Sequence, residues 1–370
     1  MRTAVLCILI SLCLTPRVAP NASVTDRVQY KTTQIPNGRA ARALNNVGQI
    51  VGMTESSGEA DDQAVVWYHR NEVTQVAAPE VRSNLRRSTV SKNTFSCAAS
   101  VNDPGQVVGY LNGETTTLPF IWAPGGDLSE MPLPSGYVGG RALRINTAGD
   151  VVGHVMSSGG VRGCVWNKGT DPRALEPLPN DTYTRARGIN DSGGVVGVSG
   201  KGPARHAVLW TSSGPARDLG TLPGDIKSEA NAINKNGDVV GISEGSNGTR
   251  AFLWNAKNGF QDLSVLPGYD NSEAYDINDS GAVVGSSNGS RGSRAFVWTA
   301  KGGMRDLNNY ISPEARVVLI SAYAINRKGQ IMVWAVDRSS CAGGETGACQ
   351  TSECPPAPKY SFLLTPANTQ

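Results

Sequence analysis

The chain has 370 residues and a formal net charge of +3. This charge is too small and too evenly spread for the basic stripe of a nucleic-acid-binding domain, so we expect no nucleic-acid partner. With Gly 43, Pro 21 and 39% hydrophobic residues, the composition indicates many short segments joined by turns around a substantial core.

The first residues predict a secretory signal peptide. Arg2 provides a basic start, an apolar run extends from Ala4 to Leu14, and a region of Pro and small residues follows. The apolar run is about half of the roughly 20 residues that a membrane-spanning helix needs. We therefore expect a signal peptide over residues 1–23 to be removed, although the sequence does not fix the cleavage point. The mature protein would then have no transmembrane segment, and we expect it to be secreted or located in the cell envelope.

A motif of the form AINKNGDVVG, found at residues 232–241, occurs seven times along the chain. Its asparagines are separated by 57, 44, 44, 44, 44 and 48 residues, and a fixed period of this size marks a repeat architecture. They are Asn45, Asn102, Asn146, Asn190, Asn234, Asn278 and Asn326. Because Asn and Gly suit tight turns, we expect each motif to be a turn between two strands.

Each regular repeat, over residues 184–310, contains four short apolar segments. The first ends in IN, the second is VVG, the third is RAFLW or HAVLW, and the fourth resembles RDLGTL. Segments of this kind, bounded by Gly, Asn, Asp, Ser or Pro, are typical of strands. Seven units of four strands predict an all-β fold, a seven-bladed β-propeller. Six blades is the alternative, because the first and last copies are irregular.

The two ends of the array carry complementary strands. VQYKTTQIPNG at 28–38 aligns with a fourth strand, whereas YSFLLTP at 360–366 aligns with a third strand and has no fourth strand after it. Pairing them would close the ring and cover an exposed sheet edge. We predict a single monomeric propeller over residues 28–366, closed by the N-terminal strand and carrying an insertion at 338–359.

Two repeated positions are predicted to lie in the core. An alanine stands four residues before each asparagine, where a small residue suits an innermost strand near the axis: Ala41, Ala98, Ala142, Ala186, Ala230, Ala274 and Ala322. The third strand ends in Trp67, Trp122, Trp166, Trp210, Trp254 and Trp298, with Leu364 in the last copy. We interpret these tryptophans as core between blades rather than as a sugar-stacking or cofactor site.

The segments HAVLW, RAFLW and RAFVW, followed by RDLGTLPG, INDSG and VVG, resemble the HAF-repeat proteins, a bacterial family of extracellular repeat proteins. The match is close over 184–310 and looser over most of 28–366. The resemblance implies export and a repeat fold, and it brings no established reaction and no catalytic residue. The last copy departs from the pattern, since Val333 replaces the glycine of VVG.

Three cysteines, Cys341, Cys349 and Cys354, fall within the insertion. An oxidising compartment would let two of them form a disulfide, and the sequence leaves open which two. A zinc site is the alternative, but no histidine is near and the spacing fits no zinc finger. Cys97 and Cys164 are expected to be buried thiols.

Several catalytic motifs have a simpler interpretation. GISEG at 241–245 and GSSNG at 285–289 match G-x-S-x-G, but Ser243 stands at a repeat position that Ser199 also occupies, so we expect no nucleophile there. Asp218, Asp262 and Asp306 recur in the fourth strand and are interpreted as turn or edge residues. His69, His154 and His206 lie at different repeat phases; we expect surface histidines, and neither a metal nor a cofactor.

The candidate ligand site is a ring five residues before each asparagine: Ala40, Cys97, Arg141, Arg185, Glu229, Glu273 and Ser321. Propellers commonly bind at the channel mouth, so Arg141, Arg185, Glu229 and Glu273 are predicted to form a polar ligand site there. A solvated or mutually paired rim is the alternative.

A second ring lies four residues before the tryptophans and is basic in blades three to six: Gln63, Leu118, Arg162, His206, Arg250, Arg294 and Tyr360. This arc could attract an acidic glycan or an anionic surface, with solvation of strand ends as the alternative.

The sequence thus predicts an exported, non-catalytic binding or scaffold module for a protein or glycan partner. The alternative is a propeller-based hydrolase or lyase with a site at the channel mouth. Clustered His, Asp, Glu or Arg side chains around a shared pocket at that mouth would favour the alternative.

Overall fold

The computed structural model describes residues 30–36, 40–54, 63–68, 73–76, 95–112, 116–211, 215–338 and 360–367. The signal segment 1–23, His69 and the three candidate disulfide cysteines Cys341, Cys349 and Cys354 lie outside these residues.

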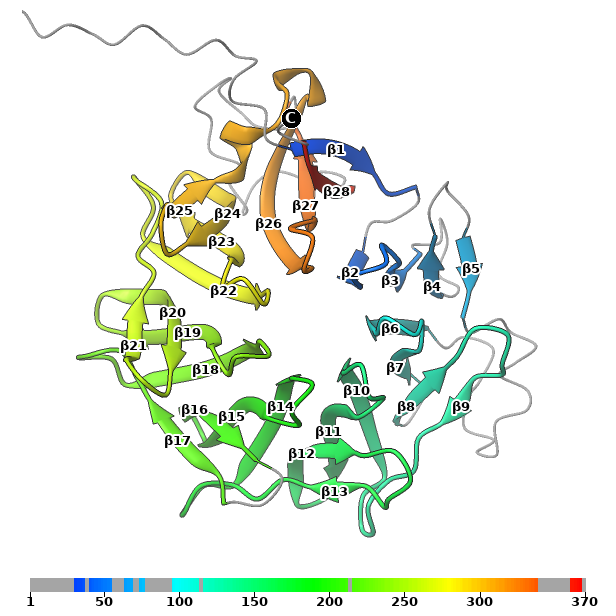
Figure 1. Ribbon diagram of the computed structural model, residues 1–370. Helices are drawn as coiled ribbons and strands as arrows, with labels where there is room; N and C mark the ends of the chain where they lie inside the picture. Colours follow the sequence, from blue (N-terminus) through cyan, green and yellow to red (C-terminus); the bar gives the residue numbers. More distant parts are fainter. Residues whose placement is uncertain are drawn as a thin grey trace, which may run out of the picture.

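The described residues form seven four-stranded antiparallel sheets around a central axis (Figure 1). Blade one contains β2 (Ala40–Leu44), β3 (Ile50–Met53), β4 (Ala64–Trp67) and β5 (Val73–Gln75). Blade two contains β6 (Ser96–Val101), β7 (Val107–Asn112), β8 (Thr117–Trp122) and β9 (Ser129–Glu130). Blade three contains β10 (Gly139–Ile145), β11 (Val151–Ser157), β12 (Gly160–Trp166) and β13 (Arg173–Ala174). Blade four contains β14 (Tyr183–Ile189), β15 (Val195–Lys201), β16 (Ala204–Trp210) and β17 (Arg217–Gly220). Blade five contains β18 (Lys227–Ile233), β19 (Val239–Gly245), β20 (Gly248–Asn255) and β21 (Gly259–Asp262). Blade six contains β22 (Asn271–Ile277), β23 (Val283–Gly289), β24 (Gly292–Thr299) and β25 (Gly303–Asp306). Blade seven is β26 (Val317–Ile325), β27 (Ile331–Asp337), β28 (Tyr360–Pro366) and β1 (Tyr30–Gln34). The seven-bladed propeller is confirmed, and the six-bladed alternative is wrong.

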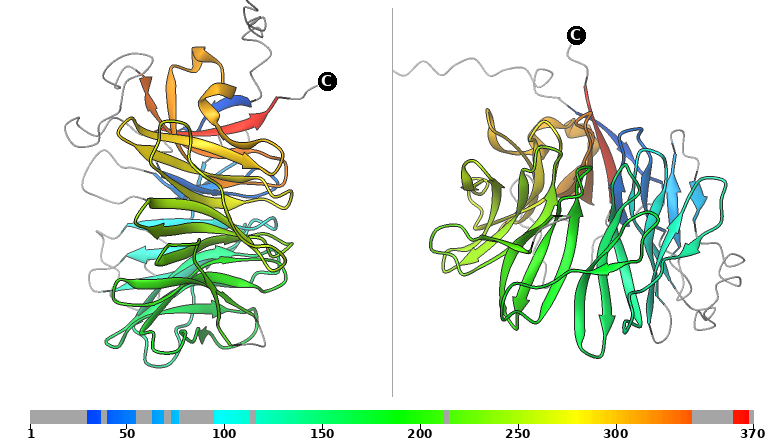
Figure 2. Two further views of the ribbon diagram at one scale, coloured as in Figure 1. Left: turned by 90° about the vertical axis from the view of Figure 1, so that its left-hand side faces the viewer. Right: turned by 60° about the horizontal axis from the view of Figure 1, so that its bottom comes forward.

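Blade seven joins the two ends of the chain. β1 pairs antiparallel with β28, with Tyr30 opposite Pro366 and Gln34 opposite Phe362. Beyond the strand pairing, Ile35 N donates to Ser361 O at 2.9 Å. Figure 2 shows the twisted sheets from the side, with β1 next to β28. The predicted closure by the N-terminal strand is confirmed.

The repeated asparagines link the blades as well as forming turns. Within each turn, the asparagine Oδ1 accepts from the backbone N–H four residues later at 2.8–3.0 Å. Each Nδ2 also donates to the backbone carbonyl of the asparagine in the next blade at 2.9–3.2 Å, and Asn326 donates to Asn45 O to complete the circle. We call this closed circle of seven hydrogen bonds the asparagine ring. Only a side chain with both an acceptor and a donor serves both purposes, which explains why asparagine recurs.

The innermost strands pack tightly against the second strands. All seven alanines before the asparagines are fully buried. In blades two to six, a Cβ placed on the VVG glycine of the second strand would overlap a carbonyl oxygen of the innermost strand. That oxygen belongs to the residue immediately before the buried alanine of the same blade. In blade seven Val333 takes the glycine position, and β26 carries two register shifts, whereas the other innermost strands carry one each.

The tryptophans of the third strand are core, as predicted. All six are at most 9% exposed. Three of them donate through Nε1 to a carbonyl of the preceding blade: Trp67 to Pro36, Trp166 to Pro132 and Trp210 to Glu176. One hydrophobic cluster, for example, combines Val240 of blade five with Phe296 and Trp298 of blade six.

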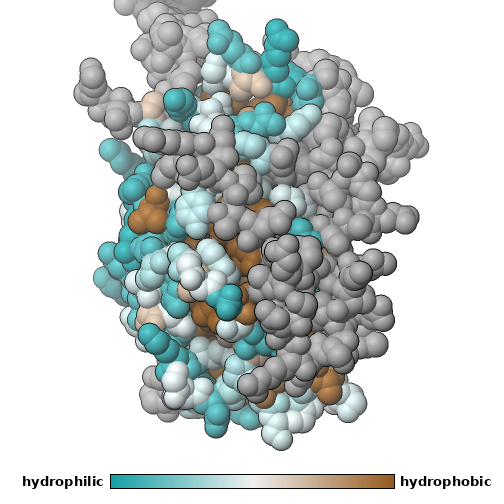
Figure 3. All heavy atoms as spheres, turned by 90° about the vertical axis from the view of Figure 1, so that its right-hand side faces the viewer, coloured by the Kyte–Doolittle hydropathy of each residue, from teal (hydrophilic) through white to brown (hydrophobic). Residues whose placement is uncertain are grey.

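Two short 3-10 helices, η2 (Leu307–Tyr310) and η3 (Pro313–Ala315), connect blades six and seven. Among the described residues, no helix is long and apolar enough to cross a membrane. Figure 3 shows the outer side of the molecule, where the coloured surface has hydrophobic patches interrupted by hydrophilic residues.

Candidate functional site

One end of the channel opens into a cavity of about 400 Å³ that we call the arginine mouth. Its lining is Ala41, Arg42, Ala99, Tyr110, Arg141, Leu143, Arg144, His154, Arg185, Arg187, Asn231, Tyr275, Tyr323 and Trp334. All seven innermost strands contribute, so the cavity is centred on the axis. Five arginines in one cavity attract anions strongly.

A β-bulge on each innermost strand presents one residue to this cavity. The strand register shifts immediately after the buried alanine, leaving the next residue as the extra one. These bulge residues are Arg42, Ala99, Leu143, Arg187, Asn231, Tyr275 and Tyr323, and all seven line the arginine mouth. Bulges are known to redirect side chains beside functional sites. This ring was not predicted from the sequence, although its members vary in type as much as those of the ring five residues before the asparagines.

Of the four residues predicted as a ligand site, Arg141 and Arg185 line the arginine mouth. The Arg141 guanidinium lies 4.6 Å from the centre of the Tyr110 ring, and its buried Nε has no hydrogen-bond partner in the described structure. Within the same residues, neither Arg141 nor Arg185 forms an ion pair. Among the described residues, therefore, no carboxylate lies within ion-pair distance of either guanidinium group.

The two predicted acidic residues do not line the cavity, because each is held by neighbouring side chains. Glu229 is buried and forms ion pairs with Arg187 and Arg205. Glu273 accepts a hydrogen bond from the Tyr275 hydroxyl at 2.9 Å. Glu229 neutralises one arginine of the mouth, and Glu273 helps to orient one of its tyrosines.

His154 lies beside the two arginines, as the cross-strand neighbour of Arg141. Burial, together with the charges of Arg185, Arg141 and Arg187, lowers its pKa to about 4. Its imidazole is therefore neutral at neutral pH, and its buried Nδ1 has no hydrogen-bond partner among the described residues. The expectation of a surface histidine was wrong here, because β11 turns this residue toward the channel.

Aromatic side chains form another part of the wall. The Tyr275 and Tyr323 rings stack with centroids 5.0 Å apart and planes 14° apart, and the Trp334 ring lies 4.2 Å from Tyr323. Trp334 Nε1 donates to Ala41 O at 3.1 Å. Because polar ends of Tyr275 and Trp334 are bound to the protein, these rings are held in place.

The second predicted ring does not reach this cavity. Three of its members contact neighbouring groups: Arg162 donates to Thr182 O, Arg294 lies 4.0 Å from Asp306, and His206 Nδ1 lies 2.8 Å from Asp218 Oδ2. His206 is a surface residue, as expected.

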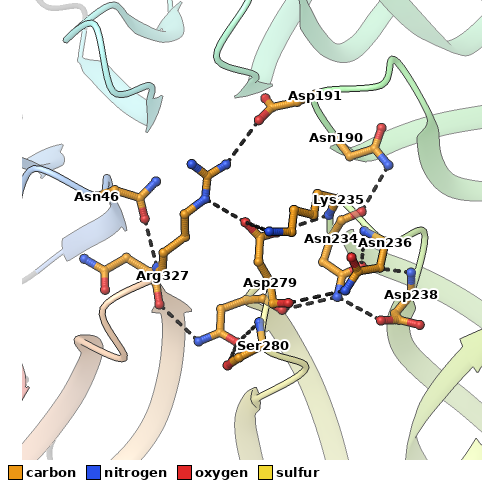
Figure 4. A network of polar contacts seen from close by, with 12 residues as sticks. Asn46, Asn190, Asp191, Asn234, Lys235, Asn236, Asp238, Asp279, Ser280 and Arg327 are labelled. Carbon is orange, nitrogen blue, oxygen red and sulfur yellow. Dashed lines mark hydrogen bonds and ion pairs between the residues drawn. The ribbon is translucent and has the colours of Figure 1, made fainter.

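At the opposite end, the asparagine ring surrounds a smaller cavity of about 180 Å³. Asp191 and Asp279 each accept from a backbone N–H of the preceding blade, and Arg327 donates to both carboxylates, at 3.3 and 2.6 Å (Figure 4). No cluster of His, Cys, Asp or Glu suited to a metal occurs in the part of the chain described. The polar groups drawn at this end are paired with each other.

The remaining sequence motifs have structural roles. Ser199, Ser243 and Ser287 are buried, and each Oγ accepts a backbone N–H from the loop before its blade's first strand. The recurring aspartates each accept the backbone N–H two residues later. Cys97 and Cys164 are buried free thiols, and burial raises the pKa of Cys164 to about 12. The predicted buried thiols and the predicted turn role of the aspartates are confirmed.

Comparison with known proteins supports the architecture. No protein-family model matches the chain, and no curated protein matches its sequence. Among solved structures, it is similar to virginiamycin B lyase from Staphylococcus aureus, with 10% identity, 90% of this chain and 98% of that chain covered, and a TM-score of 0.50. The chain is also similar to a streptogramin B lyase, with 11% identity, 90% of this chain and 97% of the lyase covered, and a TM-score of 0.50. A structure from a study of two prolyl endopeptidases is similar with 10% identity, 93% of this chain and 52% of the other chain covered, and a TM-score of 0.54. At these identities the similarity shows one thing, that the chain has a β-propeller fold.

Proposed function

We propose that the arginine mouth binds the anionic group of a ligand, so that the protein acts as a binding module. The observation that carries this proposal is the placement of Arg141 and Arg185 in one cavity of about 400 Å³, without an ion pair to either among the described residues. Like charges held close together in a partly desolvated site are unfavourable. A bound anion would relieve that repulsion.

The guanidinium group indicates which anions suit this site. Its planar arrangement of donors matches a carboxylate, sulfate or phosphate, and such bonds are stronger than those between neutral groups. Arg187 is already paired with Glu229. Of the other four arginines we assign Arg141 and Arg185 to the ligand, because both lie close enough to His154 in the same part of the wall to lower its pKa. An acidic glycan fits the glycan partner predicted from the sequence.

The test is titration calorimetry with hexuronate oligosaccharides, a sulfated oligosaccharide and inorganic phosphate at low and high salt. Hydrogen bonds to charged groups contribute about 1.5–3 kcal/mol. We therefore expect Arg141→Gln and Arg185→Gln each to weaken binding about tenfold to hundredfold. Arg305→Gln, on the outer strand β25, is the matched control and should bind as the unchanged protein does. Equal binding by all three variants would refute the proposal.

Catalysis is the second candidate function, and His154 is the observation that favours it. A neutral imidazole next to bound substrate can act as a general base, and a histidine grouped with arginines around one cavity is the feature that favours a hydrolase or lyase. Two solved structures of similar fold are lyases, which supports this candidate at the level of architecture.

A screen of lyase and hydrolase substrates with acidic groups separates the two candidates. If the protein is an enzyme that uses His154, His154→Gln should abolish turnover while the ligand still binds. Turnover that His154→Gln leaves unchanged would remove His154 from the reaction. Binding without turnover would support the binding module.

Export is a further part of the proposal, and it rests on the apolar segment after Arg2 and on the resemblance to HAF-repeat proteins. We expect the mature protein to begin near residue 23 and to contain a disulfide between two of Cys341, Cys349 and Cys354. Mass mapping of non-reduced peptides from the native protein checks both expectations, and three free thiols would contradict the second.

A further inference from the structure

The arginine mouth has two chemically different sides. Arg141 on β10 and Arg185 on β14 come from blades three and four, whereas Tyr275, Tyr323 and Trp334 come from blades six and seven. Figure 1 shows these pairs of blades on opposite sides of the channel. A ligand that fills the cavity would meet Arg141 and Arg185 on one side and these three rings on the other, with Arg42 of blade one near Tyr323 and Tyr110 of blade two beside Arg141.

The propeller scaffold does not require these aromatic residues. The bulge position that carries Tyr275 and Tyr323 holds Ala99, Leu143 or Asn231 in other blades, with the same bulge. The β27 position of Trp334 corresponds to different residue types in other blades: Met53, Tyr110, His154, Val198, Ile242 and Ser286. The aromatic group is therefore specific to blades six and seven.

The three rings pack against one another and all line the cavity. Tyr275 and Tyr323 are nearly parallel, and Trp334 is tilted by 47° against Tyr323. The Tyr275 hydroxyl bonds Glu273 and lies 3.1 Å from Ser286 Oγ, and Trp334 Nε1 bonds a backbone carbonyl. With these polar ends occupied within the protein, the apolar ring surfaces are what Tyr275 and Trp334 offer to a ligand.

We infer that the ligand of the arginine mouth carries its anionic group on a six-membered ring, whose flat face packs against Tyr323 and Trp334 while the anion binds Arg141 and Arg185. This inference rests on the proposed anion binding and adds the chemical class of the ligand. Two sources share this chemistry, a uronic acid residue of an acidic glycan and an aromatic carboxylic acid. The cavity of about 400 Å³ falls in the size range of small-molecule sites.

The experiment compares four probes by calorimetry: acetate, glucose, glucuronate and benzoate. Acetate has the anion without a ring, and glucose has the ring without the anion. We expect at least one of glucuronate and benzoate to bind about tenfold more tightly than acetate and glucose, and the tighter of the two identifies the source. Equal binding of acetate and both ring acids would overturn the inference while leaving the proposed anion site intact. No binding of any anion would overturn both.

Variants of Tyr323 test the stacking directly. Tyr323→Leu should reduce the affinity for the ring acid about tenfold and leave the affinity for acetate unchanged. Tyr323→Phe, which retains the ring, is the matched control and should bind as the unchanged protein does. A Tyr323→Leu variant that binds the ring acid with full affinity would contradict the inference.

A measurement on the unchanged protein covers the case in which Tyr323→Leu fails to fold. Protons of a ligand ring stacked on aromatic side chains should shift upfield in the NMR spectrum on binding, and those of acetate should shift less. Ring protons that show no upfield shift at saturation would contradict stacking.

Discussion

Substituting Asn190 by Asp tests the role of the asparagine ring with the smallest possible change. Asn190 is 8% exposed; its Oδ1 accepts from Gly194 N at 2.8 Å and Ser192 N at 3.2 Å, and its Nδ2 donates to Asn234 O at 3.0 Å. Aspartate keeps the acceptor within the turn. At neutral pH, however, it replaces the donor by a second carboxylate oxygen that faces the Asn234 carbonyl.

The expected loss follows from these contacts. One hydrogen bond worth about 1 kcal/mol disappears, and a buried carbonyl left without its donor costs about 1–3 kcal/mol more. Asn190→Asp should therefore lower the free energy of unfolding by about 2–4 kcal/mol at pH 7. Asn190→Ala removes the bonds within the turn as well and should be at least as destabilising.

The effect of Asn190→Asp should depend on pH. A protonated carboxyl can donate to Asn234 O again, and the native environment disfavours the charge, so the introduced carboxyl should have a pKa above its unfolded value of about 3.9. A raised carboxyl pKa means that the folded protein binds more protons, so stability falls as pH rises through that range. The difference from the unchanged protein should thus be smaller at pH 4.5 than at pH 7.

Urea unfolding at both pH values measures this difference. Ser192→Asp is the matched control, since Ser192 is exposed two residues away in the same turn and receives the same charge. If Asn190→Asp is no less stable than Ser192→Asp at pH 7, or if its deficit does not change with pH, the donor role of the asparagine ring is refuted.

Three further outcomes are expected. Deleting residues 28–36 removes β1 and exposes the edge of β28, so the melting temperature should fall sharply or oligomers should form; an equally stable monomer would contradict the closure. Gly197→Ala should lower stability by several kcal/mol in denaturant unfolding, because its Cβ would overlap a backbone carbonyl; a neutral effect would show that the strands can separate locally. The pKa of His154 is about 4 in the folded protein, so between pH 6.5 and 4 the unfolded chain binds more protons than the folded protein does. Because of this residue, the free energy of unfolding should be about 2.5 kcal/mol lower at pH 4.5 than at pH 7. His154→Gln should remove that pH-dependent loss, and an unchanged profile would show that the imidazole is not buried among the arginines.

The fold could be predicted because its determinants recur at a fixed period. The spacing of the asparagines gave the number of blades, and the complementary phase of the segments near Tyr30 and Tyr360 gave the closure. The link between blades through Asn Nδ2 could not be predicted. Its acceptor is a carbonyl 44 residues away in most blades, and the sequence does not show which side of the turn faces the neighbour.

The lining of the cavity was predicted in part, and ligand binding there stays a prediction. Choosing variable positions on a regular scaffold identified Arg141 and Arg185, which line the cavity. The same choice assigned Glu229 to the ligand, although Arg187 and Arg205 already hold it. Arg187 was missed because strict alternation along a strand does not place a bulge, and the bulge is what turns this residue toward the channel.

Because every innermost strand carries the same bulge, the lining of the cavity can be changed by one residue per blade. At this one position per blade the chain already tolerates Arg, Ala, Leu, Asn and Tyr, while the neighbouring alanine and the opposing strand keep the same geometry. A library that varies only these seven positions would change the charge, depth and aromatic content of the channel entrance, together with the contacts between blades that Arg187, Asn231 and the Tyr275–Tyr323 pair make. Paralogous chains with the same repeat could diverge in ligand by the same route, one substitution per blade.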